Sequence, residues 1–178
     1  MDKIEIKNAT IIDGLGGDPY VGNLYLNNGK IIAITNGESF DADISIDATG
    51  KVVTPGFIDL HTHSDLSFLI DSTAQSKVRQ GVTMELIGNC GMSDAAPVRD
   101  HTKELLMMKL SRYGATGDIA DNIGWADYAG YINASKKRGA TLNIAFQVGH
   151  ATIRSAVMGQ EDRPPTADEL TEMKRLAG

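Results

Sequence analysis

The sequence predicts an α/β fold in which a small β domain, residues 1–53, precedes three strand–helix units, residues 54–178. Two observations lead to this prediction. The first part of the chain holds short β-type runs separated by turn signals, and the rest alternates a β-favouring run with a helical segment. Such alternation is typical of parallel sheets whose strands are connected by helices. A chain of 178 residues is also long enough to bury a core.

Composition narrows the function classes. The hydrophobic fraction of 42% and the charged fraction of 22% are those of a soluble globular protein. A net charge of −6 argues against a nucleic-acid surface, which needs clustered Lys and Arg. The single cysteine excludes an intrachain disulfide framework. Residues 1–5 lack the pattern of a signal peptide, and no apolar run approaches the length of a membrane span. We therefore expect a cytoplasmic protein without nucleic-acid or membrane partners.

The β domain contains two turn signals. Residues 13–19 are rich in glycine, but their spacing is not that of a dinucleotide loop and no helix follows, which favours a hairpin loop. Asn27-Asn28-Gly29 lies between two β-type runs, residues 23–26 and 30–34, and predicts a tight hairpin. No group suited to catalysis stands out in this domain.

A β-favouring run, residues 57–63, follows the turn Thr54-Pro55-Gly56. In a strand, alternate side chains share a face. One face would carry Phe57, Asp59, His61 and His63, and the other Ile58, Leu60 and Thr62. The pattern sends apolar groups to an outer layer and leaves two imidazoles at the carboxyl end of the strand. Two His at i and i+2 can bind one metal ion, although a solvated pair of this kind also arises by chance.

The next segments repeat the strand–helix pattern. A helix over residues 72–80 is followed by a strand over residues 82–88, which leads into the loop that holds Cys90. The two strands should be parallel neighbours with their carboxyl ends on one side. Cys90 would then arrive at the same rim as His61 and His63.

The remaining elements are two helices, a third strand and a last helix. The helices are expected over residues 97–113 and 125–138, and the strand over residues 141–148, ending in Gly149-His150. Thr166 to Glu169 forms a capping-box signature that predicts the start of the last helix. Polar residues thus follow each predicted strand, at the face where a parallel α/β barrel places its active site.

Two imidazoles and a thiolate form a ligand set suited to Zn²⁺, which lowers the pKa of bound water toward ~7. The alternative for Cys90 is a small buried apolar residue. Asp59 and Asp65 would either orient a ligating imidazole, or cap a turn or accept a backbone hydrogen bond. His150 is a metal-site or substrate-binding candidate, or a hydrogen-bonded strand end. Arg154 would meet a substrate carboxylate or form a surface ion pair.

Three segments carry a resemblance to a known family. Pro-Gly-Phe-Ile-Asp-Leu-His-Thr-His, residues 55–63, preceded by a β domain, resembles the amidohydrolase superfamily. Gly-Val-Thr-Met-Glu-Leu-Ile-Gly-Asn-Cys-Gly-Met-Ser, residues 81–93, resembles its D-aminoacylase (N-acyl-D-amino-acid deacylase) branch, and residues 148–159 are similar to the segment after the third strand there. The resemblance covers essentially the whole chain.

The resemblance implies the N-terminal part of a TIM-like (β/α)8 metal-dependent hydrolase barrel, preceded by a small β-sandwich segment. His61 and His63 match the ligands of the first strand, and Cys90 matches a thiolate that can bridge two metal positions. One or two zinc ions per complete site are implied. Two further His ligands and an Asp general base would lie beyond Gly178.

The resemblance further implies zinc-dependent hydrolysis of N-acyl-D-amino acids by a longer parent protein, with this chain alone inactive. Two alternatives stay open. One is an amidohydrolase acting on cyclic amides or D-peptides, for which a carboxylated Lys on a fourth strand would be diagnostic. The other is a non-catalytic fragment that binds metal or a partner chain. An open sheet edge would also favour self-association.

Overall fold

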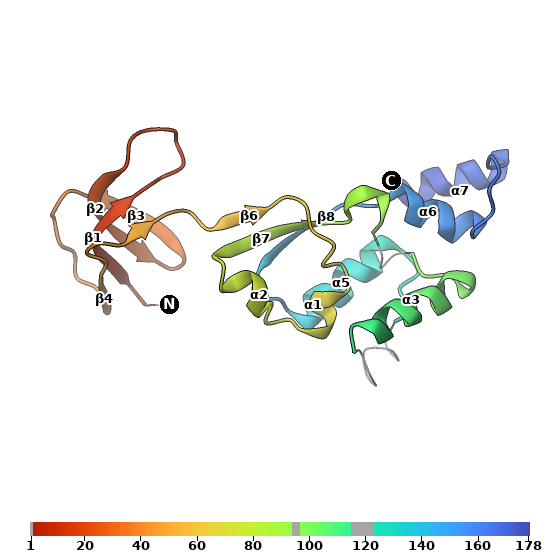
Figure 1. The fold of residues 1–178 in the computed structure, drawn as a ribbon, viewed down its shortest axis with the longest axis horizontal. Helices are drawn as coiled ribbons and strands as arrows, with labels where there is room; N and C mark the ends of the chain where they lie inside the picture. Colours follow the sequence, from red (N-terminus) through yellow and green to blue (C-terminus); the bar gives the residue numbers. More distant parts are fainter. Residues whose placement is uncertain (1, 94–96, 115–122) are drawn as a thin grey trace. The chain divides into compact units, whose positions relative to one another are not determined.

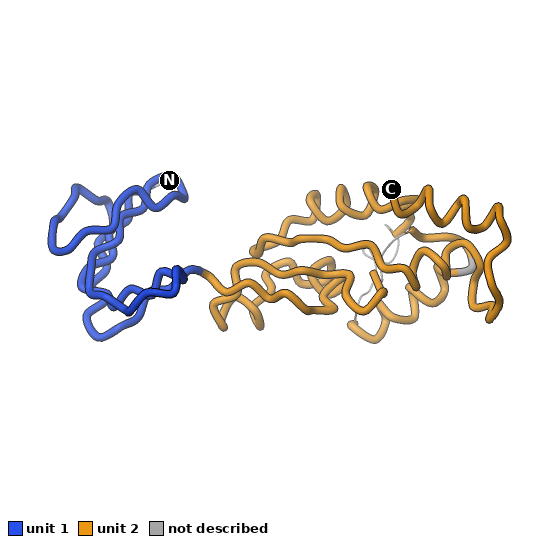
Figure 2. The backbone as a smooth tube through the Cα atoms, turned by 90° about the horizontal axis from the view of Figure 1, so that it is seen from above, with its two compact units in different colours: residues 1–55 blue, residues 56–178 orange. Residues whose placement is uncertain are grey.

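The computed structural model describes residues 2–93, 97–114 and 123–178 (Figure 1). The chain divides into two compact units, Met1–Pro55 and Gly56–Gly178, drawn in different colours in Figure 2. The sequence placed this boundary between residues 53 and 54, two residues earlier. Both positions fall at the turn Thr54-Pro55-Gly56, and each unit is described by itself.

Unit 1 is a five-stranded sheet with the order β3-β2-β1-β4, in which β5 also pairs with β1. Its strands are β1 (Ile4–Ile11), β2 (Tyr20–Asn27), β3 (Lys30–Thr35), β4 (Ile44–Asp47) and β5 (Val52–Val53). β1 runs antiparallel to β2 and parallel to β4 and β5. The described strands of this unit therefore form one sheet, a single layer of the predicted sandwich.

Both predicted turns of unit 1 connect antiparallel strands. Asn27 pairs with Lys30, and the two residues between them, Asn28 and Gly29, have φ of 51° and 73°. Positive φ at both central positions is the requirement of a type I′ hairpin, so the tight hairpin is confirmed. The glycine-rich segment 13–19 joins β1 to β2, which confirms a hairpin loop and excludes the strand-to-helix context of a dinucleotide loop.

A buried carboxylate, Glu5 of β1, holds the middle of this sheet together. It is 2% exposed and accepts hydrogen bonds from Tyr25 Oη, from Ser39 Oγ at 2.9 Å and from Ser45 Oγ at 3.0 Å, while Lys7 Nζ lies 3.0 Å away. These groups, the Tyr25 hydroxyl first, lower the pKa of Glu5 to about 2. Because three hydroxyl donors and an ammonium group contact it, the charged carboxylate is the favoured form in the fold.

Replacing this residue, Glu5→Gln, is expected to lower hydrogen-exchange protection of the β1 and β2 amides by about tenfold at pH 7, since bonds to a charged acceptor are lost. The folded pKa of Glu5 lies below its ordinary 4.5, so its stabilisation is complete above pH 4.5 and is lost as pH falls toward 2. The difference between wild type and variant should shrink over that window. Fluorescence of Trp125, the only Trp, monitors unit 2 as the control. Equal protection at pH 7 would contradict the assignment.

Unit 2 contains a parallel sheet with the order β6-β7-β8. The strands are β6 (Phe57–Asp59), β7 (Val82–Ile87) and β8 (Asn143–Phe146). The helices are α1 (Ser67–Ile70), α2 (Gln75–Val78), the 3-10 turn η1 (Asn89–Gly91), α3 (Asp100–Arg112), α5 (Tyr128–Arg138), α6 (His150–Met158) and α7 (Ala167–Ala177). Parallel strands joined by helical connections confirm the predicted α/β fold class.

The core of unit 2 lies on one face of this sheet. Ile87 of β7 is fully buried against Phe68 of α1, Leu110 of α3 and Tyr131 of α5. Ile58, which points to the opposite face in the strand register, is 56% exposed. Helices therefore cover one face of the described sheet, as seen for α1, α2 and α5 in Figure 1. In the part of the chain that the structure describes, no helix has the length and apolar character needed to cross a membrane.

Most predicted elements of unit 2 are present with ends shifted by a few residues, but one predicted helix is shorter and two helices were not predicted. The helix expected over residues 72–80 is limited to α2, because Asp71 Oδ1 accepts bonds from the Thr73 backbone at 3.0 Å and hydroxyl at 2.5 Å, and Ala74 has a φ of 44°. α1 and α6 were not predicted. The capping box at the start of α7 is confirmed, with Thr166 and Glu169 exchanging hydrogen bonds of 2.7 and 3.3 Å.

Candidate metal centre

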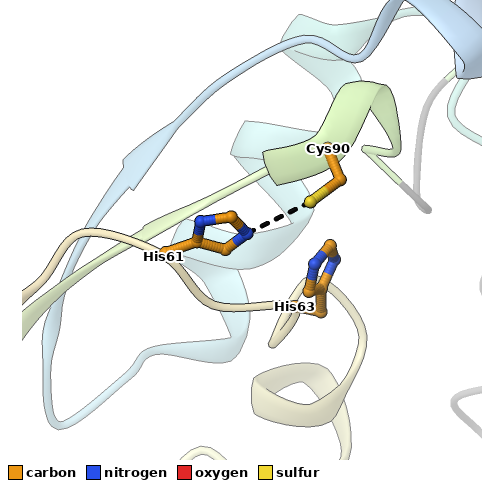
Figure 3. A group of neighbouring side chains, drawn as sticks. All are labelled: His61, His63 and Cys90. Atoms are coloured by element: carbon orange, nitrogen blue, oxygen red, sulfur yellow. Dashed lines mark hydrogen bonds between the residues drawn. The ribbon is translucent and has the colours of Figure 1, made fainter.

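Three side chains that follow two neighbouring strands lie close together. His61 and His63 follow β6, and Cys90 lies in η1 directly after β7. Their ligand atoms all lie within 4.8 Å of one another, and His61 Nε2 is 3.1 Å from Cys90 Sγ (Figure 3). The imidazole centroids of His61 and His63 are 5.7 Å apart. The predicted convergence at one rim is confirmed, because β6 and β7 are parallel neighbours.

The strand that carries the histidines is shorter than predicted. β6 ends at Asp59, and the side chains of Ile58 and Leu60 are 56% and 68% exposed, whereas Thr62 is buried. The expected outer apolar layer over residues 57–63 is therefore wrong. The chain leaves the strand because Asp59 Oδ1 accepts a hydrogen bond of 3.2 Å from the backbone N–H of His61. Both imidazoles consequently stand on a loop at the carboxyl edge of the sheet.

The backbone of Cys90 has a strained conformation. Its φ of 56° lies in the left-handed region, where a residue with a side chain costs about 1–3 kcal/mol. Gly88 and Gly91 on either side also have positive φ, of 83° and 75°. The amide of Asn89 donates to the carbonyls of Leu86 at 2.7 Å and of Thr62 at 3.2 Å. Asn89 thus joins the loop of the thiol to the loop of the two imidazoles.

The two aspartates differ in what they contact. The Asp59 carboxylate bonds to the Lys77 ammonium, and this bond, followed by the His61 N–H, lowers the pKa of Asp59. The Asp59 carboxylate therefore bonds to a backbone N–H and to an ammonium group rather than to an imidazole ring. Asp65 is buried, and its carbonyl accepts a hydrogen bond of 2.7 Å from Tyr131 Oη. A role of Asp65 in orienting an imidazole stays a prediction.

His150 and Arg154 lie outside the three-residue group. His150 begins α6, and the preceding Gly149 packs so tightly on the thiol loop that an added Cβ would lie 2.2 Å from the Gly91 carbonyl oxygen. This contact brings the start of α6 beside η1. The Arg154 guanidinium donates to the carbonyls of Glu161 at 2.8 Å and Arg163 at 2.6 Å, and it lines a cavity of about 410 Å³. Substrate binding by His150 and Arg154 stays a prediction.

The donor set fits a zinc ion. Zn–N distances of about 2.0–2.1 Å and a Zn–S distance of about 2.3 Å place donors of a tetrahedral site roughly 3.3–3.6 Å apart. The donors of His61, His63 and Cys90 are within 4.8 Å of one another, so small side-chain rotations suffice. All three side chains are exposed, which leaves room for a water and a substrate. Two imidazoles and one thiolate are also the ligand types that zinc accepts.

Sequence reasoning missed three residues around this group: Lys77, Glu85 and Asn89. Glu85 lies inside a strand-like run and Lys77 inside a predicted helix. Charged residues are common in such helices, so Lys77 did not stand out, and nothing in the run marked Glu85 as functional. Only Asn89 carried a signal, its position between two glycines and beside Cys90.

A ligand cluster at the carboxyl edge of parallel strands defines a class of α/β proteins with a metal site. Within that class, a profile of the amidohydrolase family matches residues 45–178, and the chain belongs to that family.

Curated relatives agree with the predicted branch. The chain is 35% identical over 172 residues to N-acyl-D-glutamate deacylase of Alcaligenes xylosoxydans xylosoxydans, covering 96% of this chain and 33% of the relative. It is 33% identical over 175 residues to D-aminoacylase of the same organism, covering 97% of this chain and 34% of the relative. The resemblance to this branch is confirmed, and the chain spans about a third of the relatives' length.

Solved structures give the same result. N-acyl-D-glutamate deacylase from Bordetella bronchiseptica, complexed with zinc and a phosphonate inhibitor, matches with a TM-score of 0.79 at 33% identity, covering 97% of this chain and 35% of that chain. A D-aminoacylase structure described by its binuclear metal centre matches with a TM-score of 0.83 at 33% identity, covering 98% and 35%. The fold class of this chain is therefore that of these proteins.

Proposed function

We propose that the full-length gene product, of which this chain forms part, hydrolyses the amide bond of small N-acyl-D-amino acids with zinc held by His61, His63 and Cys90. The observation that carries this proposal is the convergence of three ligand atoms within 4.8 Å. Membership of the amidohydrolase family and the deacylase names of the relatives support the reaction type and the substrate class.

In this proposal His61, His63 and Cys90 hold the ion, and Asn89 supports their loops. Bound zinc would supply a water of lowered pKa and polarise the amide carbonyl. His61 would bind the ion through Nε2 of a neutral ring, the atom that lies 3.1 Å from Cys90 Sγ. Cys90 gives up its Sγ proton when metal binds, because the thiolate is the ligand form. Asn89 joins the loop of the thiol to the loop of the imidazoles and would keep the donors near one another.

The complete site needs groups that lie outside these 178 residues. By resemblance, these are two further His ligands and an Asp general base beyond Gly178. We therefore propose one or two zinc ions in the complete site and no hydrolysis by the isolated chain. We also propose that the isolated chain self-associates through β6 and β8, each of which pairs only with β7 among the described strands.

The test is hydrolysis by the full-length gene product loaded with zinc. N-acetyl-D-methionine and its L enantiomer are assayed by release of the free amine, and a hydantoin at equal concentration by formation of its N-carbamoyl amino acid. We expect kcat/KM for the D substrate to exceed that for the L substrate by at least ~100-fold, because even discrimination by the fit of apolar groups reaches about that value. Preferential opening of the hydantoin would instead support the cyclic-amide alternative, and no turnover of any substrate would contradict the proposal.

A further inference from the structure

A charged group lies directly behind the loop that carries the two imidazoles. Lys77 of α2 places its Nζ against Asp59 Oδ2 at the end of β6, 3.3 Å from Thr62 Oγ1 and 3.7 Å from Glu85 Oε2 of β7. The Glu85 side chain is 2% exposed, and that of Lys77 is 25% exposed. One ammonium group thus connects a helix, a strand end and the neighbouring strand.

This ammonium group is linked to the histidine loop at Asp59 and Thr62 directly, and at Ser64 through Glu85. The Asp59 carboxylate accepts the N–H of His61 at 3.2 Å. Thr62, between the two histidines, shares a hydrogen bond of 2.7 Å with Ser64, and Ser64 Oγ donates to Glu85 Oε2 at 3.0 Å. Asp59 before His61, Thr62 between the two histidines and Ser64 after His63 are therefore held by side chains that converge on Lys77.

The charges explain why the ammonium is needed there. Asp59 and Glu85 are register partners on adjacent parallel strands, so their carboxylates face the same side of the sheet. A buried carboxylate without a cation is strongly unfavourable, and two adjacent ones repel each other. If Lys77 were removed, the change that costs the least free energy would be a movement of Asp59, because Asp59 lies at the end of its strand. The backbone of His61, which is bonded to Asp59, would move with it.

We propose that Lys77 is a positioning residue for His61 and His63, acting through Asp59, Thr62 and Glu85. The inference rests on the proposed metal centre and adds a residue to it. Ligands displaced by even 1 Å bind a metal poorly, and partners of metal ligands typically contribute about 10–100-fold to affinity. The Lys77 ammonium contacts Asp59, Thr62 and Glu85 rather than an imidazole ring or the thiol, so its effect on the ligands passes through the loop backbone.

The test uses the full-length gene product in metal-free form, titrated with Zn²⁺ and Co²⁺ against a competing chelator. Four variants are compared: Lys77→Met, Lys77→Arg, the pair Lys77→Met with Glu85→Gln, and Lys174→Met on the exposed surface of α7 as the matched control. The double variant removes the buried charge that a missing ammonium would leave, so it separates a folding defect from a positioning defect. Thermal unfolding of the metal-free proteins monitors the fold.

We expect Lys77→Met and the double variant to lose about 10–100-fold in Zn²⁺ affinity, because both lack the bonds of the ammonium to Asp59 and Thr62. Their visible Co²⁺ bands should also weaken, because the bands report a tetrahedral geometry. Lys77→Arg and Lys174→Met should stay within about threefold of wild type, since the charge is kept in the first and the loop is untouched in the second.

Three results would overturn the inference. Wild-type affinity and an unchanged Co²⁺ spectrum in the double variant would show that the loop needs no ammonium. A double variant that does not fold would make Lys77 a folding residue. If the wild-type protein bound neither metal, the proposed metal centre would be wrong, and the inference about Lys77 would fall with it. This outcome differs from the other two because it is measured on the wild-type protein and needs no variant.

Discussion

Cys90→Ala in the full-length gene product is expected to remove at least ~100-fold of kcat/KM, because loss of a ligand should exceed the cost of losing a ligand's partner. The fold should be kept. Cys90 is exposed, so its side chain contributes little packing. Alanine also has a Cβ, so the left-handed backbone at φ 56° costs about the same in both proteins.

The measurement combines three readouts on the same samples: kcat/KM, zinc content and thermal unfolding. Met92→Ala is the matched control, because Met92 is exposed and lies two residues further along the same loop. It should keep activity and zinc. Near-normal turnover and zinc content in Cys90→Ala would mean that the thiol is not a ligand.

The isolated 178-residue chain is expected to show no hydrolysis of N-acetyl-D-methionine above a His61→Ala control, even with stoichiometric zinc. His61, His63 and Cys90 offer three ligands on an exposed edge. The general base expected from the family resemblance lies beyond Gly178, and its loss alone costs about 10²–10⁴-fold. Ligands that lack neighbouring strands to hold them are also free to shift, which is costly in catalysis.

The experiment measures amine release by the purified chain beside the full-length gene product, with sedimentation to follow self-association. Association through the edge strands would change the oligomeric state without adding ligands. Turnover at rates typical of enzymes would show that a working site is complete within these 178 residues.

Local sequence signals predicted much of the fold and of the site. Asn28-Gly29 required positive φ and therefore specified a hairpin, and Thr166 with Glu169 specified a helix start. The convergence of Cys90 with the two histidines followed from the order of elements alone, because parallel neighbours end at the same edge.

Only the tertiary structure decided where β6 ends and what supports its loop. β6 ends at Asp59, whose carboxylate binds both Lys77, eighteen positions away, and the His61 N–H. Glu85 is buried because Ser64 and Lys77 satisfy it, although its place in the strand run gave no sign of either partner. The periodicity of a sequence predicts which residues share a face. Whether a charged residue can be buried depends on partners that folding brings together from distant positions.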